Sequence, residues 1–165
     1  MDRSNTLAAG GTAPDFTLPD ECSRPVSLDS LIEDQPVALL FFPSVWGMMC
    51  SVEMSTFRDM FSEVERTGGR MIAVSTNSPM SHAAWCDHMR LPFHILSDFD
   101  GKVSNRYGIL CGDEGYLKGR CTRAIFIVDQ KKRLRFVWVA DDPSYEPDYD
   151  LVIRSLAEAA GRSAP

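Results

Sequence analysis

The sequence predicts an α/β fold in which a central mixed sheet is covered by helices on both faces. Residues 37–42 form a continuous apolar run, which is typical of a strand buried on both sides. Apolar runs at 124–128 and 134–139 flank a basic turn and predict an antiparallel pair. Apolar residues between 57 and 64 recur with the period of an amphipathic helix. Strands and helices that alternate in this way predict helices on both faces of one sheet.

The first part of the chain is predicted to contain a leader, a hairpin and a long helix. Residues 1–10 are polar and small, and we interpret them as a loose leader. Residues 16–18 and 26–28 are short alternating segments around a proline-containing turn, which predicts a small hairpin. The apolar strand at 37–42 then leads into a helix from about 49 to 66.

The middle of the chain continues the alternation. Residues 71–75 are a second candidate for a buried strand. Ser78 is predicted to cap a helix that begins at Pro79 and runs to about Met89. A short strand at 93–96 and a short helix at 102–107 follow.

The last part of the chain completes the order. Residues 108–121 contain four glycines and predict a loop, and residues 149–160 form a closing amphipathic helix. The resulting order of strands and helices is that of a thioredoxin-like sheet. At 165 residues, the chain is predicted to form a single domain.

Composition excludes several classes of partner. The net charge of −6 argues against nucleic acid and anionic membranes, because both require a basic face. No run approaches the length of a membrane span, and the first residues lack the apolar core of a signal peptide. We therefore expect a cytoplasmic protein.

The five cysteines are an odd number without a CxxC motif, which favours a catalytic or sensing thiol over a disulfide scaffold.

One cysteine occupies a chemically favoured position. Cys50 follows Pro43 and Gly47 and lies in the first turn of the predicted 49–66 helix. Unpaired backbone N–H groups and the positive end of the helix dipole stabilise a thiolate there. The sequence therefore predicts a nucleophilic thiolate presented to solvent. Cys22, by contrast, is interpreted as a small core residue.

The residues around Cys50 resemble the peroxiredoxin signature Pro-x-x-x-Thr/Ser-x-x-Cys, because Pro43 and Cys50 have the matching separation. Other segments that resemble this family are Glu53, Phe57–Asp59, Ser75–Ser78, Leu91–Asp98 and Thr122–Asp129. The resemblance spans about residues 10–140 and points to the AhpE-like and bacterioferritin-comigratory (PrxQ-like) branches.

This resemblance implies a thioredoxin-like fold and a thiol peroxidase that reduces hydrogen peroxide or organic hydroperoxides. It implies that Cys50 attacks the peroxide and becomes a sulfenic acid, while Arg123 lowers the thiol pKa and orients the substrate. Pro43 is expected to shield the thiolate, and Gly47 and Met49 to line the substrate site with it. Neither a metal nor another cofactor is expected.

Gly47 departs from the signature, because the family has Thr or Ser there. Losing one hydrogen bond at a transition state costs about 2–4 kcal/mol, although a water molecule in the space beside Gly47 would reduce this cost. The alternative interpretation is therefore a catalytically weakened redox sensor or binding protein on the same scaffold. A third interpretation, a thioredoxin-like reductase or isomerase, is disfavoured because the chain has no CxxC motif.

The resemblance also implies a resolving thiol. Cys86, in the predicted 79–89 helix, corresponds in its separation from Cys50 to the resolving cysteine of PrxQ-like proteins. Cys111, Cys121 and an external thiol remain as alternatives. A bond between Cys50 and Cys86 requires local unwinding, since two helix-bound cysteines rarely lie within disulfide range. A thioredoxin-like or small-thiol reductant and a homodimer are also expected.

Overall fold

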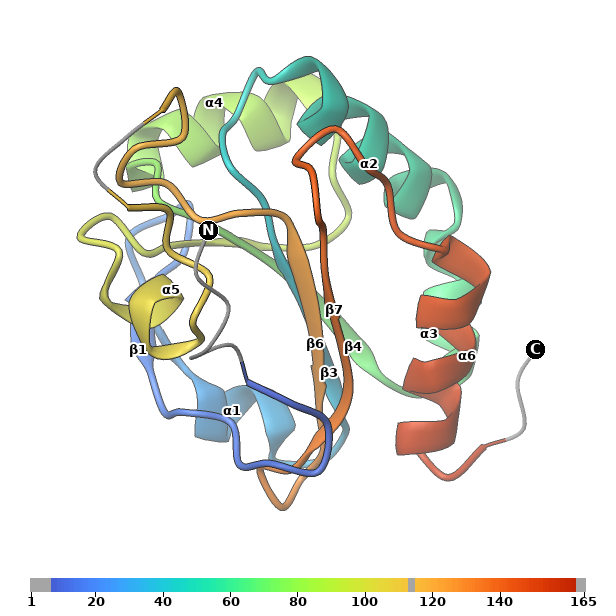
Figure 1. The fold of residues 1–165 in the computed structure, drawn as a ribbon. Coiled ribbons are helices and arrows are strands. Elements are labelled where there is room, and N and C mark those ends of the chain that lie inside the picture. Colours follow the sequence, from blue (N-terminus) through green and yellow to red (C-terminus); the bar gives the residue numbers. More distant parts are fainter. Residues whose placement is uncertain (1–6, 113–114, 163–165) are drawn as a thin grey trace.

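The computed structural model describes residues 7–112 and 115–162 (Figure 1). The central strands are β3 (Val37–Phe41), β4 (Arg70–Ser75), β5 (Ile95–Ser97), β6 (Ala124–Val128) and β7 (Leu134–Val139). They form one sheet in the order β5-β4-β3-β6-β7. The pairs β3–β4 and β4–β5 are parallel, whereas β3–β6 and β6–β7 are antiparallel. The sheet is therefore mixed, as predicted.

Helices cover both faces of this sheet, which confirms the predicted α/β architecture. One face carries α1 (Leu28–Ile32) and α5 (Lys102–Arg106), and the other carries α2 (Met48–Asp59), α3 (Phe61–Thr67), α4 (Pro79–Met89) and α6 (Tyr149–Ala159). Side chains of β3 alternate between the two resulting cores. Leu39 and Phe41 pack on the α1 side, and Ala38 and Leu40 pack on the α2 side.

The predicted N-terminal hairpin is present, but its second strand ends early. It pairs β1 (Thr17–Pro19) with β2 (Pro25–Ser27) in antiparallel register. The predicted strand at 26–28 was wrong at its end, because α1 begins at Leu28. The hydroxyl of Ser27 caps this helix by accepting from Ser30 N–H at 3.1 Å.

The predicted helix from 49 to 66 is two helices. Met60 leaves helical geometry (φ −92°, ψ 8°) and ends α2, and α3 begins at the next residue. The break turns α3 so that it packs against α6. The apolar period of the sequence continues across Met60, so it gave no sign of this bend. The strand predicted at 93–96 lies slightly later, at Ile95–Ser97.

The first six residues of the expected leader lie outside the described residues. The part that follows contacts the body of the protein: Leu7 packs against the core, and Gly10 N–H donates to the Leu134 carbonyl at 2.7 Å. Among the described residues, no helix has the length and apolar character needed to cross a membrane.

Candidate active site

The turn between β3 and α2 positions Cys50. The buried strand β3 ends at Phe41, and Gly47 is the N-cap of α2 without contributing a side-chain cap. Cys50 is the third residue of α2, so it lies in the turn whose backbone N–H groups lack helical partners. Its side chain, however, is only 4% exposed and packs in the core on the α2 side. The expectation of a thiolate presented to solvent was therefore wrong.

Arg123 reaches Cys50 from the neighbouring strand. It directly precedes β6, which pairs with β3 so that Ala124 lies opposite Phe41. The Nη2 atom of Arg123 lies 3.6 Å from the Cys50 sulfur. Its Nε and Nη2 atoms also donate to the Pro143 carbonyl, at 3.3 and 3.0 Å. These contacts fix a guanidinium that is only 1% exposed beside the sulfur.

Glu53 is a residue of this site whose role the sequence analysis did not assign. It lies one helical turn after Cys50, is fully buried, and binds Arg123 Nη1 through Oε2. Its Oε1 atom has no hydrogen-bond partner among the described residues. Burial raises the pKa of Glu53 to about 7, and the charge of Arg123 opposes this rise. The signals in the sequence were its three-residue spacing from Cys50 and its place in the family resemblance.

The pKa of the Cys50 thiol is raised above its ordinary value. Burial is the largest cause, because it disfavours the charged form. A hydrogen bond from the Ser44 backbone N–H and the charge of Arg123 both lower the pKa, whereas the charge of Glu53 raises it. Arg123 therefore acts in the predicted direction, but burial outweighs it in this conformation.

A pocket of about 480 Å³ opens beside Cys50. Its lining includes the predicted substrate-site residues Pro43, Gly47 and Met49, and also Arg123. Met48 and Tyr116, which are 78% and 84% exposed, give it an apolar rim. A space large enough for a small organic molecule thus lies next to the sulfur.

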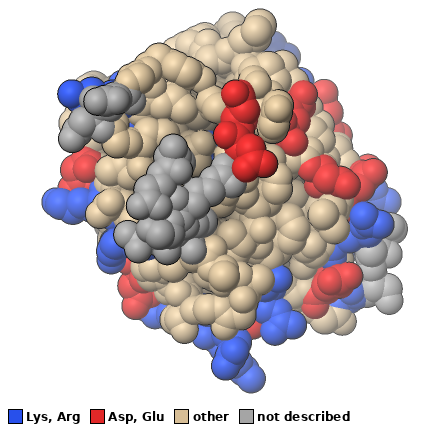
Figure 2. All heavy atoms as spheres, in the orientation of Figure 1, with Lys and Arg blue, Asp and Glu red and all other residues tan. Residues whose placement is uncertain are grey.

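Acidic side chains border this pocket. Figure 2 shows them gathered over the segment that joins β7 to α6, where Asp141, Asp142, Glu146 and Asp148 are exposed. The same segment contributes Pro143 and Ser144 to the pocket lining. The opening is therefore acidic on one side, while the guanidinium lies within the pocket.

A side chain at position 47 would lie close to the Cys50 sulfur. Its backbone (φ −67°, ψ 136°) is one that any residue adopts. A Cβ atom placed at this position would lie 3.3 Å from the Cys50 sulfur and 3.3 Å from the Ser44 carbonyl oxygen. Both contacts are tighter than ordinary van der Waals contact, so a side chain here requires its neighbours to shift by a few tenths of an ångström, whereas the backbone conformation itself does not require glycine.

The loop before α2 is held from two sides. Val45 N–H donates to Asn77 Oδ1 at 3.2 Å, and Asn77 is bonded in turn to Ser75. Trp46 adopts a left-handed conformation (φ 63°), and its ring lies 4.9 Å from that of His88 on α4. For a residue other than glycine this conformation is strained. The surrounding contacts therefore fix the loop that precedes Cys50.

The other cysteines are not gathered around Cys50. All five are free, and Cys86 lies on α4 outside the pocket lining, although it packs against the same core as Cys50. Cys121 lies in the core on the opposite face, where its thiol donates to the Phe42 carbonyl at 3.0 Å. Cys111 is half-buried. Cys22 is exposed, so its interpretation as a core residue was wrong.

Comparison with protein families matches residues 9–137 to the AhpC/TSA family. "Peroxiredoxin Q, chloroplastic" from Sedum lineare is 33% identical over 140 residues, covering 82% of this chain and 73% of that protein. "Alkyl hydroperoxide reductase E" from Mycobacterium tuberculosis is 34% identical over 132 residues, covering 79% and 84%.

Comparison with solved structures also finds peroxiredoxins. The peroxidoxin BcpB from Mycobacterium tuberculosis superposes with a TM-score of 0.79 at 26% identity, covering 93% of this chain and 96% of that one. A peroxiredoxin-like protein from Aquifex aeolicus superposes with a TM-score of 0.85 at 25% identity, covering 95% and 90%. With a cysteine at the start of α2 and an arginine beside it, the chain belongs to the AhpC/TSA family of peroxiredoxins and is a thiol-dependent peroxidase.

Proposed function

We propose that Cys50 is the peroxidatic residue. Its thiolate attacks one oxygen of a hydroperoxide, the O–O bond breaks, and Cys50 becomes a sulfenic acid. The other oxygen leaves with the bonding electrons and takes up a proton, giving water or an alcohol. The contact between Arg123 Nη2 and the Cys50 sulfur, at 3.6 Å, is the observation that carries this assignment.

Arg123 stabilises two negative charges in this step, one before the reaction and one in the transition state. A fixed cation beside the sulfur favours the thiolate, and it also stabilises the charge that develops on the departing oxygen. Backbone N–H groups in the first turn of α2 act on the same oxygen, because they lack helical partners. Pro43, Gly47 and Met49 form the wall against which the peroxide lies.

Cys86 resolves the sulfenic acid in this proposal. Its thiol condenses with Cys50 to a disulfide and releases water. Both residues lie in helices, α2 and α4, so the bond requires that at least one helix unwinds locally. Cys121 is a weaker candidate because its sulfur lies in the core on the other face of the sheet. Cys111 and an external thiol remain as alternatives.

We further propose that a thioredoxin-like or small-thiol reductant reduces the disulfide and returns the enzyme to its thiol form.

The chain acts as one domain and forms a homodimer, for which the exposed apolar residues Trp46, Met48 and Val52 provide surface. Its five free thiols fit a reducing compartment, the cytoplasm. Sedimentation velocity tests the dimer: a monomer at micromolar concentration contradicts this part of the proposal.

The second candidate function is a redox sensor with weakened peroxidase activity. Two observations favour it: Gly47 lacks the hydroxyl of the family signature, and burial raises the pKa of the Cys50 thiol. A sensor of this kind reacts slowly with peroxide and signals through the oxidised form of Cys50. The two functions differ in rate and in whether a reductant sustains repeated turnover.

Peroxide consumption in the presence of dithiothreitol tests the assignment of Cys50. We expect Cys50→Ser to abolish catalysed consumption and Cys111→Ser to retain it. Equal consumption by Cys50→Ser and wild type contradicts the proposal. If oxidation of Cys50 occurs once per chain but no turnover follows, the sensor is supported instead.

A further inference from the structure

The turn between β4 and α4 carries a side chain that reaches the loop before Cys50. The Oδ1 atom of Asn77 accepts from the Val45 backbone N–H at 3.2 Å, although the two residues are 32 positions apart in the sequence. Val45 is only 7% exposed, so its N–H group depends on an acceptor within the protein. This hydrogen bond ties the loop between β3 and α2 to the turn that begins α4.

A buried serine and a buried histidine support Asn77. Ser75 Oγ lies 3.3 Å from Asn77 Oδ1, 3.2 Å from the Asn77 backbone nitrogen and 2.6 Å from His82 Nε2. Burial lowers the pKa of His82 to about 4, so its ring is neutral and carries one N–H group at pH 7. The Nδ1 atom of His82 has no hydrogen-bond partner among the described residues. Because buried N–H groups without an acceptor are rarer than buried acceptors without a donor, we assign the proton to Nε2.

This assignment satisfies each group around Asn77. His82 Nε2–H and Asn77 N–H donate to Ser75 Oγ, whose own hydrogen is then donated to Asn77 Oδ1. Ser75 O–H and Val45 N–H together fill the two acceptor sites of Asn77 Oδ1. The amide has one acceptable orientation, since its NH2 group would otherwise face the Val45 N–H. The hydrogen bonds therefore run in one direction, from α4 to the loop before Cys50.

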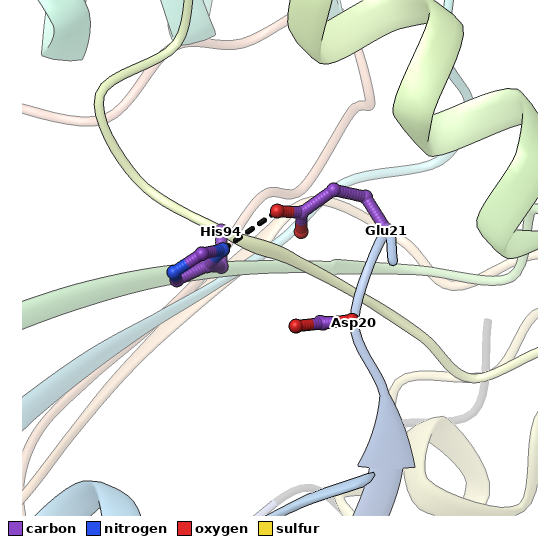
Figure 3. A group of neighbouring side chains, drawn as sticks. All are labelled: Asp20, Glu21 and His94. Carbon is purple, nitrogen blue, oxygen red and sulfur yellow. Dashed lines mark hydrogen bonds and ion pairs between the residues drawn. The ribbon is translucent and has the colours of Figure 1, made fainter. Parts of the chain in front are cut away.

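The strand β5 holds the backbone of Asn77. At the end of β5, Ser97 Oγ donates to the Asn77 carbonyl at 2.5 Å. At its start, the strand is fastened by Glu21, whose carboxylate points toward His94 in Figure 3, with Oε1 and Nδ1 2.7 Å apart. The Oε2 atom of Glu21 also accepts from Ile95 N–H at 3.3 Å. Asn77 is therefore bonded to a strand that is fixed at both ends, and it offers the loop a fixed point.

The loop that Asn77 holds contains a group that acts on the Cys50 sulfur. The Ser44 backbone N–H forms a hydrogen bond with this sulfur and stabilises its anion, and Val45 is the next residue. Trp46 follows in a left-handed conformation (φ 63°), which is strained for a residue other than glycine. This strain favours another loop conformation once the bond to Val45 is lost. Asn77 therefore keeps the Ser44 N–H group beside the sulfur.

The Val45–Asn77 bond also joins the starts of the two helices that carry the proposed disulfide. Val45 lies two residues before the N-cap of α2, and Asn77 directly precedes the N-cap of α4. A bond between Cys50 and Cys86 requires that at least one of these helices unwinds locally. Because Cys50 is the third residue of α2, unwinding α2 around it displaces the helix start. The bond to Asn77 opposes this displacement.

We propose that Asn77 is a positioning residue of the peroxidase site, which holds the loop before Cys50 in the conformation that reacts with peroxide and releases Val45 when Cys50 pairs with Cys86. This inference rests on the proposed function, in which Cys50 is first oxidised and then resolved. The Val45–Asn77 bond favours the first step, because it keeps the thiolate supported. The same bond slows the second step, because it must break before the disulfide forms.

Two substitutions of Asn77 separate its hydrogen bond from the rest of the fold. Asn77→Ala removes the acceptor for Val45, whereas Asn77→Asp keeps an acceptor oxygen and serves as the rescue. Asn105→Ala is the control, since it makes the same change at an exposed position of α5, on the other face of the sheet. Each protein is mixed with excess hydrogen peroxide and quenched at successive times. Peptide mass spectrometry then follows the loss of the Cys50 thiol and the formation of the Cys50–Cys86 bond.

The two steps should respond in different ways. We expect Asn77→Ala to lose the Cys50 thiol about tenfold more slowly than wild type, as the loss of one buried hydrogen bond predicts. Its oxidised form should give the disulfide at least as fast as wild type. Asn77→Asp should recover most of the first rate, and Asn105→Ala should match wild type in both steps. If Asn77→Ala loses the thiol as fast as wild type, or if both steps slow together, the proposal is overturned.

Exchange of the Val45 amide hydrogen, measured by NMR on the reduced protein, tests the bond without peroxide. It should be about tenfold faster in Asn77→Ala than in wild type or Asn77→Asp. The Phe42 amide, which donates to the Val74 carbonyl at 3.1 Å, should not change. Equal Val45 exchange in wild type and Asn77→Ala overturns the inference, even if Cys50 proves to be peroxidatic. Faster exchange in a protein whose Cys50 ignores peroxide overturns the proposed function and the positioning role, while the hydrogen bond itself stands.

Discussion

The guanidinium of Arg123 serves two buried acidic groups at once: its Nη2 atom lies 3.6 Å from the Cys50 sulfur, and its Nη1 atom binds the Glu53 carboxylate. Glu53 is fully buried and Cys50 nearly so. A single cation shared between two potential anions stabilises each less than it would stabilise one alone. The ionisation of Cys50 therefore depends on Glu53 as well as on Arg123.

Replacing Glu53 with Gln is expected to lower the pKa of Cys50, because the substitution removes a negative charge and keeps an acceptor for Arg123. Burial raises the pKa of Glu53 to about 7, so the wild-type carboxyl is mostly charged only above that pH. The gain in Cys50 reactivity should thus be larger at pH 8 than at pH 6, about three- to tenfold at pH 8. Rates of alkylation by iodoacetamide measure it.

The matched control for this substitution is Glu65→Gln, which changes an exposed carboxylate on α3. It should leave the alkylation rate at Cys50 unchanged. A Glu53→Gln protein that alkylates no faster than this control at pH 8 contradicts the shared-cation account.

Restoring a hydroxyl at position 47 is expected to speed the reaction of Cys50 with peroxide. The backbone at Gly47 accepts any residue, and a Cβ atom would lie 3.3 Å from the sulfur. A transition-state hydrogen bond is worth about 2–4 kcal/mol, so Gly47→Ser or Gly47→Thr should gain on the order of a hundredfold in single-turnover rate. Gly47→Ala separates the hydroxyl from the added bulk: equal rates for Ser and Ala would show that the hydroxyl has no role.

The buried His82 should make folding stability sensitive to acid. Its Nε2 atom bonds Ser75 Oγ at 2.6 Å, and burial lowers its pKa to about 4. Below the usual value of 6.5 the unfolded chain binds a proton that the folded chain does not. Stability is therefore fully present above pH 6.5 and is lost as the pH falls toward 4, by up to about 1.4 kcal/mol per pH unit.

Urea denaturation of His82→Asn at pH 7, 5.5 and 4 tests this dependence. The variant should be less stable than wild type at pH 7, and the difference should shrink at pH 4, since Asn does not titrate. Ala83→Asn, at an exposed and non-titrating position on the same helix, should keep the wild-type dependence of stability on pH. If the stabilities of His82→Asn and wild type change equally between pH 7 and pH 4, the lowered pKa of His82 is contradicted.

Much of the fold could be predicted from local patterns. The central strand β3 is apolar at every position and is buried at every position, and Pro79 after Ser78 marked the start of α4 correctly. Two features of the fold were not predicted, the helix α1 and the break between α2 and α3. Helix α1 has five residues, too few for a visible apolar period. The bend at Met60 falls inside a continuous apolar period, so the local pattern did not mark it.

The site was predicted in part. The position of Cys50 after a buried strand followed from the sequence, whereas its proximity to Arg123 required the resemblance to a family and the pairing of β3 with β6. Burial of the Cys50 sulfur depends on tertiary packing that no local pattern encodes.

The most direct test of the account is the single-turnover rate of peroxide reduction by Cys50 with and without the charge of Arg123. The variants to compare are Glu53→Gln and the double variant Arg123→Met/Glu53→Gln, because the double variant leaves no buried carboxylate unpaired. At pH 7 the double variant should react on the order of a hundredfold more slowly, with a higher pKa for Cys50. If the two variants have the same melting temperature and reduce peroxide at the same rate, the claim that the Cys50 thiolate depends on the Arg123 guanidinium is contradicted.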